Sequence, residues 1–302
     1  MRKIFYIALL LFCTNSVVGQ NKLTNAVYSL KNGELDKAKE LIDAASEDST
    51  FIDKPATWYY RGFIYKDLFK RDEASNINSE LREKSIEYFT KAYQMEQGSP
   101  FSKGCENAIK YFAETFYNQF ATSFNPNDYP IAVSSFDRYK DLSRRINPDA
   151  DFTEKDIQFN LAMGSTFNRI ASIDSNNAAI NMEKSIEYYR KVLAVDSNNF
   201  SANYNLGIIY YNKGVEIVKK MDYGLDLDEL TKMQDELFDI FRTSLPYMKK
   251  AYDLDPRRRE TLIGLEGIYF SMNNVEKFEL FKKKIQELDD DGESNGSDTP
   301  NK

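Results

Sequence analysis

The sequence predicts an all-α protein built from stacked helical hairpins, and three observations lead to this class. Residues 83–92 read EKSIEYFTKA and residues 183–192 read EKSIEYYRKV, so the same opening block of six residues recurs after 100 residues. In the first segment Ile86, Phe89 and Ala92 follow one another at intervals of three, which is typical of one face of an amphipathic helix. No stretch shows the sustained alternation of apolar and polar residues that predicts a strand.

The first 19 residues have the layout of a secretory signal peptide. Arg2 and Lys3 form a basic start, and an apolar run of ten residues follows from Ile4 to Cys13. That run is too short to span a bilayer, and small or medium residues precede a predicted cut before Gln20. We therefore expect an exported chain, periplasmic or associated with the cell envelope, whose mature part does not span a membrane.

The chain has two cysteines, and neither predicts a disulfide within the mature protein. A lipid anchor on Cys13 is the alternative to a cleaved signal, but such anchors usually need a small residue before the Cys, and Phe12 stands there. Removal of the signal leaves Cys105 alone. We expect Cys105 to be a small buried apolar residue.

Composition excludes several classes of function. The 302 residues include 47 Asp and Glu against 40 Lys and Arg, and the net charge of −7 disfavours nucleic acid as a partner. The absence of His removes Ser–His–Asp and Cys–His catalysis and the commonest zinc ligand. Phosphate-binding, dinucleotide-binding and metalloprotease motifs are also missing from the sequence. The sequence thus predicts a protein that is not an enzyme and needs no cofactor or metal.

Two segments place a Gly among aromatic and apolar residues at helical spacing, and they read WYYRGFIY (58–65) and NYNLGIIYY (203–211). The corresponding positions are Trp58, Gly62 and Tyr65 in the first and Leu206, Gly207 and Tyr210 in the second. They resemble the W-x2-L-G-x2-Y pattern of the tetratricopeptide repeat (TPR) family, whose unit is a helix–turn–helix. The resemblance implies a right-handed solenoid of hairpins, each with a first helix (helix A) and a second helix (helix B). The Gly then lets two helices approach closely.

Six hairpins follow one another along the chain, separated by short segments with Pro, Asn, Asp or Ser. Their predicted ranges are 21–47, 56–97, 102–147, 154–197, 201–256 and 259–288. In the first, Gly33 makes the turn. The second contains the Gly62 pattern and the repeated EKSIEY block. The third has Ala132 and Phe136 on helix B and Pro148 after it.

The last three hairpins end in comparable ways. The fourth closes with VLAVDSNN, the fifth with AYDLDP, and the sixth has VEKFELFKKKIQEL as its helix B. Residues 289–302 are acidic and rich in Gly, Ser and Asn, which predicts a disordered tail. The predicted organisation is therefore a signal peptide over 1–19, a TPR-like α-solenoid over 20–288 and a tail over 289–302.

The spacing between the helix-A Gly position and a small residue of helix B separates plain hairpins from lengthened ones. The TPR pattern has about 12 residues there, and hairpins one, three and six keep this spacing. The longer spacings run from Gly62 to Ser85, from Ala162 to Ser185 and from Gly207 to Ser244. We therefore expect lengthened helices in hairpins two, four and five, with polar connectors at their tips.

In the TPR family helix A lines a concave groove that binds a partner, and the resemblance carries its slots over to this chain. The residues in those slots are Tyr59, Phe63, Lys66, Tyr117, Phe124, Phe159, Met163, Phe167, Tyr204, Ile208, Tyr211 and Asn212. Most are aromatic, and Tyr combines a large contact area with a hydroxyl group. We expect the set to bind an extended peptide or a helix of a protein partner in the cell envelope.

Three alternatives accompany this interpretation. The same side chains are also suited to packing between helices as core residues. An aromatic groove also suits a glycan, although the single Trp weakens that reading. A hydrolase that uses two carboxylates is the third. Some TPR proteins hold a C-terminal carboxylate with Lys and Asn on helix A, but here those slots hold Tyr59, Tyr117 and Phe159, so we do not expect this mode.

Overall fold

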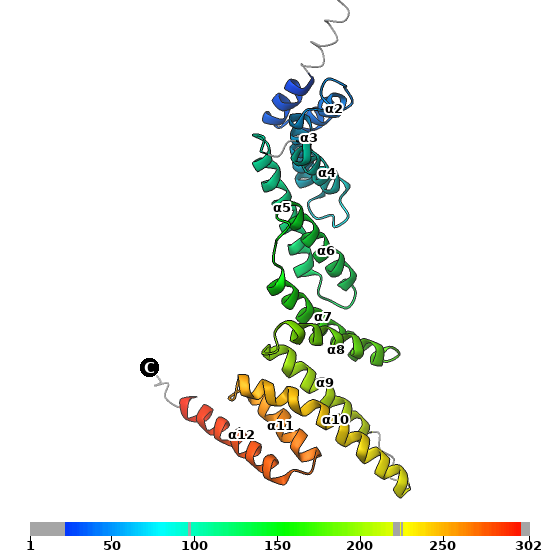
Figure 1. Cartoon of the computed structure of the whole chain (residues 1–302), viewed down its shortest axis with the longest axis vertical. Helices are drawn as coiled ribbons and strands as arrows, with labels where there is room; N and C mark the ends of the chain where they lie inside the picture. Colours follow the sequence, from blue (N-terminus) through cyan, green and yellow to red (C-terminus); the bar gives the residue numbers. More distant parts are fainter. Residues whose placement is uncertain (1–21, 96–97, 220–223, 225, 297–302) are drawn as a thin grey trace, which may run out of the picture. The chain divides into compact units, whose positions relative to one another are not determined.

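The structure is a computed structural model that describes residues 22–95, 98–219, 224 and 226–296, with side chains up to residue 290. Every regular element in these ranges is helical and no strand occurs among them, which confirms the all-α prediction (Figure 1). The predicted signal peptide lies outside the described residues, as do residues 297–302 of the predicted tail. The chain divides into two compact units, and each is described by itself.

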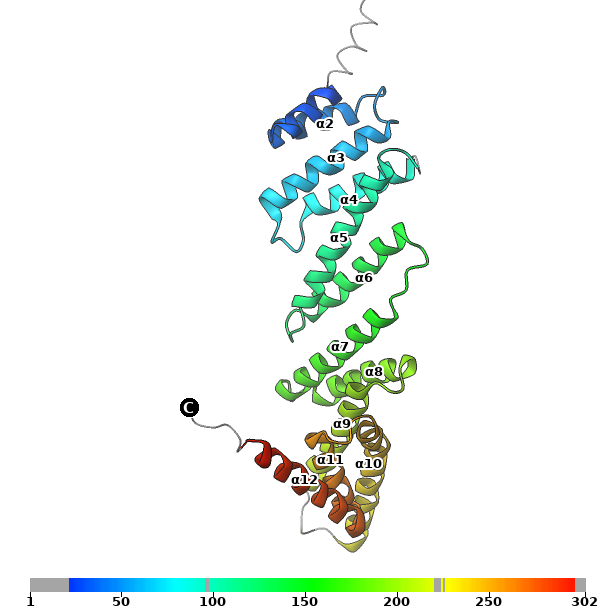
Figure 2. The ribbon, with the colours of Figure 1, turned by 90° about the vertical axis from the view of Figure 1, so that its left-hand side faces the viewer.

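The first unit comprises Met1–Ser123 and Pro130–Asp151. It begins with a helix over residues 22–31, and Gly33 makes the turn that follows with a φ of 77°. The next elements are α2 (Leu35–Ser46), α3 (Pro55–Leu68), a π-helical turn (Phe69–Glu73), α4 (Glu80–Met95), α5 (Ser102–Thr122) and α6 (Tyr129–Ile146). Neighbouring helices pack along the chain, α2 on α3, α3 on α4 and α4 on α5 (Figure 2). Phe120 and Phe136, whose rings are 4.8 Å apart, join α5 to α6.

The second unit comprises Phe124–Tyr129 and Phe152–Lys302. Its helices are α7 (Thr153–Ile173), α8 (Ala178–Val195), α9 (Phe200–Lys219), α10 (Leu227–Leu254), α11 (Arg259–Ser271) and α12 (Val275–Gly296). The closest pairs are α7 with α8, α9 with α10 and α11 with α12, which are the helix pairs of predicted hairpins four, five and six. A capping box between Asp226 and Glu229 starts α10, because each residue bonds the backbone N–H of the other.

One contact between helix A and helix B recurs in three hairpins. A Ser hydroxyl of helix B donates to a Gly carbonyl of helix A, and the pairs are Ser85–Gly62 (2.8 Å), Ser185–Gly164 (2.7 Å) and Ser244–Gly207 (2.6 Å). A large side chain four residues after each Ser then lies against the same Gly, namely Phe89, Tyr189 and Met248. A Cβ on any of these glycines would come within 2.8–3.0 Å of that side chain. Beside the rings of Phe89 and Tyr189 only Gly therefore permits this approach of the two helices, whereas at Gly207 the nearest atom is the flexible end of Met248.

This contact corrects the predicted register of the fourth hairpin. The sequence comparison placed Ala162 in the position of the helix-A Gly, but the hydroxyl of Ser185 reaches the carbonyl of Gly164. The separation is 21 residues, not the predicted 23. The physical reason is the ring of Tyr189, since a Cβ at position 164 would lie 2.8 Å from it. The helix-A slots predicted on α7 consequently shift by two residues, to Leu161, Ser165 and Arg169.

The lengths of the helices show where the extra residues go. In the fourth hairpin α7 has 21 residues and α8 has 18, and in the fifth α9 has 20 and α10 has 28, so both helices take up the insertion. The third hairpin, predicted as plain, is also long, with 21 residues in α5 and 18 in α6. At the C-terminus α12 continues to Gly296, beyond the predicted boundary at residue 288. Arg259 and Asp289 form an ion pair of 2.8 Å in this added part.

A substitution of Gly62 by Ala tests the helix contact in hairpin two. In an open helix position this change stabilises by up to about 1 kcal/mol, because Ala is the better helix former. Here the new Cβ would lie 2.9 Å from the Phe89 ring, so we expect a destabilisation of about 1–3 kcal/mol in chemical denaturation. The double variant Gly62→Ala with Phe89→Leu relieves the clash and should lose less stability than the sum of the two single changes. Additive losses would contradict the contact.

Candidate functional site

The predicted groove residues of the first unit lie mainly on α3. Tyr59 and Phe63 are half-buried and have ring centres 4.8 Å apart. The Tyr59 ring also lies 4.8 Å from Phe101 and occupies the space that a side chain at Gly104 would need. Tyr59 therefore joins hairpin two to hairpin three as well as presenting one edge to solvent.

Lys66 extends the same face of α3 by one turn. Its ammonium lies 4.2 Å from the centre of the Phe63 ring, which is the range of a cation–π contact. Burial lowers the pKa of Lys66, and the nearby charge of Lys70 lowers it further. Tyr117 on α5 is half-buried against Tyr139 of helix B, at 5.1 Å between ring centres. It thus contributes to the interior of hairpin three.

The residues predicted on α7 do not all reach the surface. Met163 and Phe167 are 0% and 4% exposed, so these two are core residues and the prediction of groove contacts for them is wrong. The shift of two residues described above explains this, because they occupy positions that face helix B. Phe167 stacks on Tyr188 of α8 with ring centres 5.6 Å apart. Phe159 on the same helix is half-buried, as is Phe124 in the segment before α6.

On α9 the predicted residues follow the correct register, because Gly207 is the helix-A Gly. Tyr204, Ile208 and Tyr211 are half-buried, and Asn212 is exposed. Tyr204 stacks on Phe200 at 5.9 Å, and burial raises its pKa. Tyr211 fills the space above Gly267 of α11, just as Tyr59 fills the space above Gly104.

Two helices therefore carry the same arrangement relative to their Gly. The positions compared are three residues before this Gly, one residue after it and four residues after it. On α3 they hold Tyr59, Phe63 and Lys66, and on α9 they hold Tyr204, Ile208 and Tyr211. We call these two sets the helix-A faces. Each set consists of large half-exposed side chains. One Tyr of each set is also held in place, because its ring packs on a Gly of a neighbouring hairpin. Such surfaces suit contacts with a peptide or a helix.

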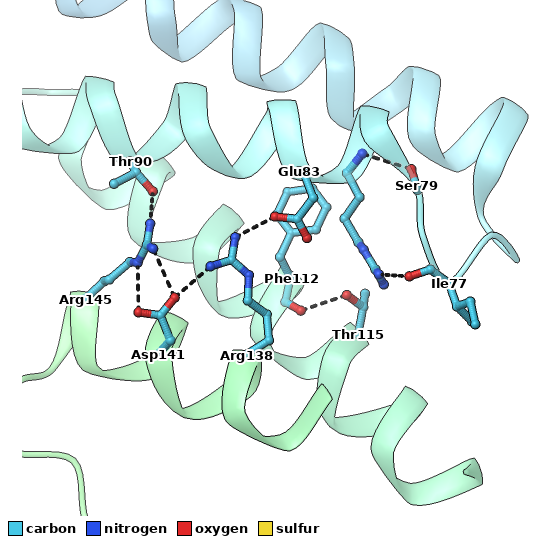
Figure 3. A network of polar contacts seen from close by, with 10 residues as sticks. Ile77, Ser79, Glu83, Thr90, Phe112, Thr115, Arg138, Asp141 and Arg145 are labelled. Carbon is cyan, nitrogen blue, oxygen red and sulfur yellow. Dashed lines mark hydrogen bonds and ion pairs between the residues drawn. The ribbon is translucent and has the colours of Figure 1, made fainter. Parts of the chain in front are cut away.

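A polar network that the sequence reasoning missed joins α4 to α6 (Figure 3). Arg138 donates to Glu83 at 2.5 Å and to Asp141 at 2.8 Å. Arg145 shares Asp141 at 3.0 Å and reaches the Thr90 hydroxyl at 3.4 Å. The spacing of Arg138, Asp141 and Arg145, at intervals of three and four residues, is the sequence signal that could have indicated one charged helix face.

A pocket of about 620 Å³ lies over this network. Besides the two arginines, its lining includes Lys84, Lys91 and Glu87. Both signs of charge are therefore present at close range, and the ion pairs are largely exposed, so each contributes only about 0–1 kcal/mol.

No group of three or more acidic or Cys side chains among the described residues is placed to hold a metal ion. None of the described helices is both long and apolar enough to cross a membrane. Cys105 on α5 is fully buried, as predicted, and burial raises the pKa of its thiol to about 11.

The burial of Cys105 predicts a thiol that does not react in the folded protein. Reaction with a disulfide reagent requires the thiolate, which is scarce at pH 8 when the pKa is about 11, and the side chain is also shielded. For residues 20–302 we expect no reaction over minutes in native buffer and one equivalent after unfolding in guanidinium chloride. Rapid modification of the native protein would contradict the buried position.

A match to one family model supports the repeat assignment. Residues 181–214 match the family model described as TPR repeat, a stretch that begins in α8 and ends in α9. A monomeric mutant of IFIT1 with Gppp-AAAA is similar at 14% identity and a TM-score of 0.32, over 86% of this chain and 58% of that one. The TPR domain of P58(IPK) is similar at 12% identity and a TM-score of 0.21, over 92% and 99%. This chain thus spans 58% of the IFIT1 chain. No curated protein matches.

Proposed function

Because residues 181–214 match the tetratricopeptide-repeat model, we propose that this chain is an exported, non-enzymatic scaffold that binds a peptide or protein partner along its helix-A faces. TPR folds generally mediate protein–protein interactions, and TPR proteins are typically scaffolds without catalytic activity. The partner would be met in the cell envelope, with the periplasm of a two-membrane bacterium as the compartment that the signal sequence favours.

The observation that carries the proposal is the repeated helix-A face. All six of its side chains are half-buried. Three of them, Tyr59, Tyr204 and Tyr211, are tyrosines, a type that is enriched among the residues that dominate binding energy at interfaces. The buried parts of these side chains already pack on neighbouring helices. Little side-chain entropy is therefore lost when a partner covers the parts that are exposed to solvent. An extended peptide or an amphipathic helix presents the spaced apolar side chains that such a face accepts.

The buried position of Trp58 argues against the glycan alternative. The indole is 6% exposed, and its N–H donates to the carbonyl of Ile52 at 2.7 Å. The residue best suited to stack on a sugar ring is therefore occupied inside the first unit. A polypeptide partner makes better use of the Tyr, Phe and Lys side chains that do reach the surface.

A substitution series on α9 tests the binding face. Tyr204→Ala with Tyr211→Ala should lower capture of the partner from envelope extract by at least tenfold, because both rings lose their contact area. Since Tyr211 also supports α11, the helical circular dichroism and melting of the variant are measured alongside. Asn212→Arg changes an exposed side chain of the same face and should weaken capture without lowering stability.

The matched control for this series is Asn198→Arg, which puts the same charge on an exposed turn residue ahead of α9. It should leave capture unchanged. Full capture by both α9 variants would refute the helix-A face as the binding surface. Loss of folding in the double variant, with unaffected capture by Asn212→Arg, would assign the two tyrosines to the core.

The export prediction has its own measurement. When residues 1–302 are produced in a two-membrane bacterium, the protein in the periplasmic fraction should begin at Gln20 by intact mass. Leu9→Arg with Leu10→Arg interrupts the apolar run and should leave uncut protein in the cytoplasm. Cys13→Ser is the control, because it affects only a lipid anchor. Uncut wild-type protein in the cytoplasm would count against export.

A further inference from the structure

A buried arginine without a carboxylate partner stands out in the first unit. Arg82, in the first turn of α4, is only 4% exposed. Its guanidinium donates to the backbone carbonyl of Ile77 at 2.6 Å and to the side-chain oxygen of Gln119 at 3.1 Å, and both acceptors are neutral. The Nε–H has no partner at all. Buried charges are normally paired with an opposite charge, so Arg82 departs from the rule.

The surroundings of Arg82 stabilise the cation only in part. The Phe116 ring lies 4.0 Å below the guanidinium, a close cation–π contact. Burial is nevertheless the main reason that the pKa of Arg82 lies below its ordinary value, and the second guanidinium of Arg138 lowers it further. Glu83 opposes this effect, but its carboxylate is engaged by Arg138. One positive charge in this region is therefore left without a direct counter-charge.

A pocket of about 370 Å³ lies next to this group, between α4, α5 and α6. Its charged lining residues are Arg82, Arg138 and Glu83, which together carry one net positive charge. Gln119 and Ser135 are among its polar lining residues, and Ile77 and Phe116 are among the apolar ones. Ser135 is 2% exposed, and its hydroxyl also has no hydrogen-bond partner. Two buried polar atoms without a hydrogen-bond partner, Nε of Arg82 and the hydroxyl oxygen of Ser135, thus belong to residues that line a single pocket.

We propose that this pocket is a binding site for a single carboxylate group, which takes the donor groups of Arg82 and Ser135. The charge on the lining selects the ligand, because one unmatched guanidinium balances one negative charge. A phosphate dianion would need a second free cation, and Arg138 is already paired with Glu83 and Asp141. The apolar lining from Ile77 and Phe116 accommodates the short hydrocarbon stem of a carboxylic acid.

Binding includes a small rearrangement of the lining. Both unpartnered atoms are shielded from water, so the Ser135 hydroxyl rotates toward the ligand and the neutral amide of Gln119 yields its place on Arg82. The exchange replaces a hydrogen bond from the guanidinium to a neutral amide oxygen by one to a charged carboxylate oxygen, which adds an ion pair. The site uses helix-B side chains together with α5 and is separate from the helix-A faces, so it does not rest on the proposed partner.

The substitution Gln119→Glu tests this site by supplying the carboxylate from the chain itself. It places a carboxylate on the chain at the position that now lies 3.1 Å from the guanidinium. We expect a higher melting temperature without ligand and no further response to added carboxylate. The control is Gln286→Glu, the same change of charge on the exposed face of α12, which should leave the response intact.

The ligand experiment uses propanoate, the capped peptide N-acetyl-Ala-Glu-Ala-amide and phosphate as probes at constant ionic strength. Calorimetric titration of the purified protein should show saturable binding of a carboxylate probe, and Ser135→Ala should weaken it by about tenfold or more. The Ser135→Ala protein should fold normally, since the hydroxyl makes no hydrogen bond in the free protein. Tighter binding of the peptide than of propanoate would identify an acidic side chain as the source, and the reverse would identify a free small acid.

Three results would overturn the proposal. These are the absence of saturable binding by both carboxylate probes, equal affinity of the Ser135→Ala and wild-type proteins, and phosphate binding as tight as that of the carboxylates. Loss of the response in Gln286→Glu to the same extent as in Gln119→Glu would also count against it.

Discussion

The contact between a helix-A glycine and a large helix-B side chain sets the geometry of the hairpins. Gly62 with Phe89, Gly164 with Tyr189 and Gly207 with Met248 bring two helices into close contact, and beside the two aromatic rings no residue other than Gly fits without a shift. The Ser hydroxyl four positions before each large side chain donates to the Gly carbonyl, which fixes the register along the helix axis as well as the separation. Once both are fixed, the face that helix A turns away from its partner is determined.

A binding site on helix A can be predicted from the sequence only where the helix-A Gly is identified correctly, because this Gly determines which face of the helix points outward. On α9 the Gly is adjacent to Leu206, as in the TPR pattern, and the predicted residues do lie at half-exposed positions. On α7 residues 160–165 read NLAMGS. Judged by residue type alone, Ala162 and Gly164 are both small enough to occupy the position of the helix-A Gly. Only the Tyr189 ring distinguishes them, since it leaves no room for a Cβ. An error of two residues in the register of α7 therefore placed two core side chains, Met163 and Phe167, among the predicted groove contacts.

The boundaries of the hairpins could be predicted closely because they depend on local signals such as Pro55 and Gly33. The charged features could not. Arg82 comes shortly after a polar connector and before Glu83, a context in which an exposed side chain is expected. Its burial follows from Phe116 and Gln119, which arrive from α5 more than thirty residues later. The surface of the first unit has aromatic side chains on α3, and it has the charged network of Arg138 on α4 and α6.

The single tryptophan has a consequence for following this protein in solution. Trp58 is held in the first unit by its bond to Ile52, with the ammonium of Lys91 3.4 Å from the centre of the indole ring. Helical repeats interact mainly with their neighbours, so parts of such a chain open with different free energies. Indole fluorescence therefore reports the integrity of hairpin two and its surroundings, whereas circular dichroism averages over all the helices. Wherever the two signals separate, hairpin two opens at a different denaturant concentration from the average of the helices.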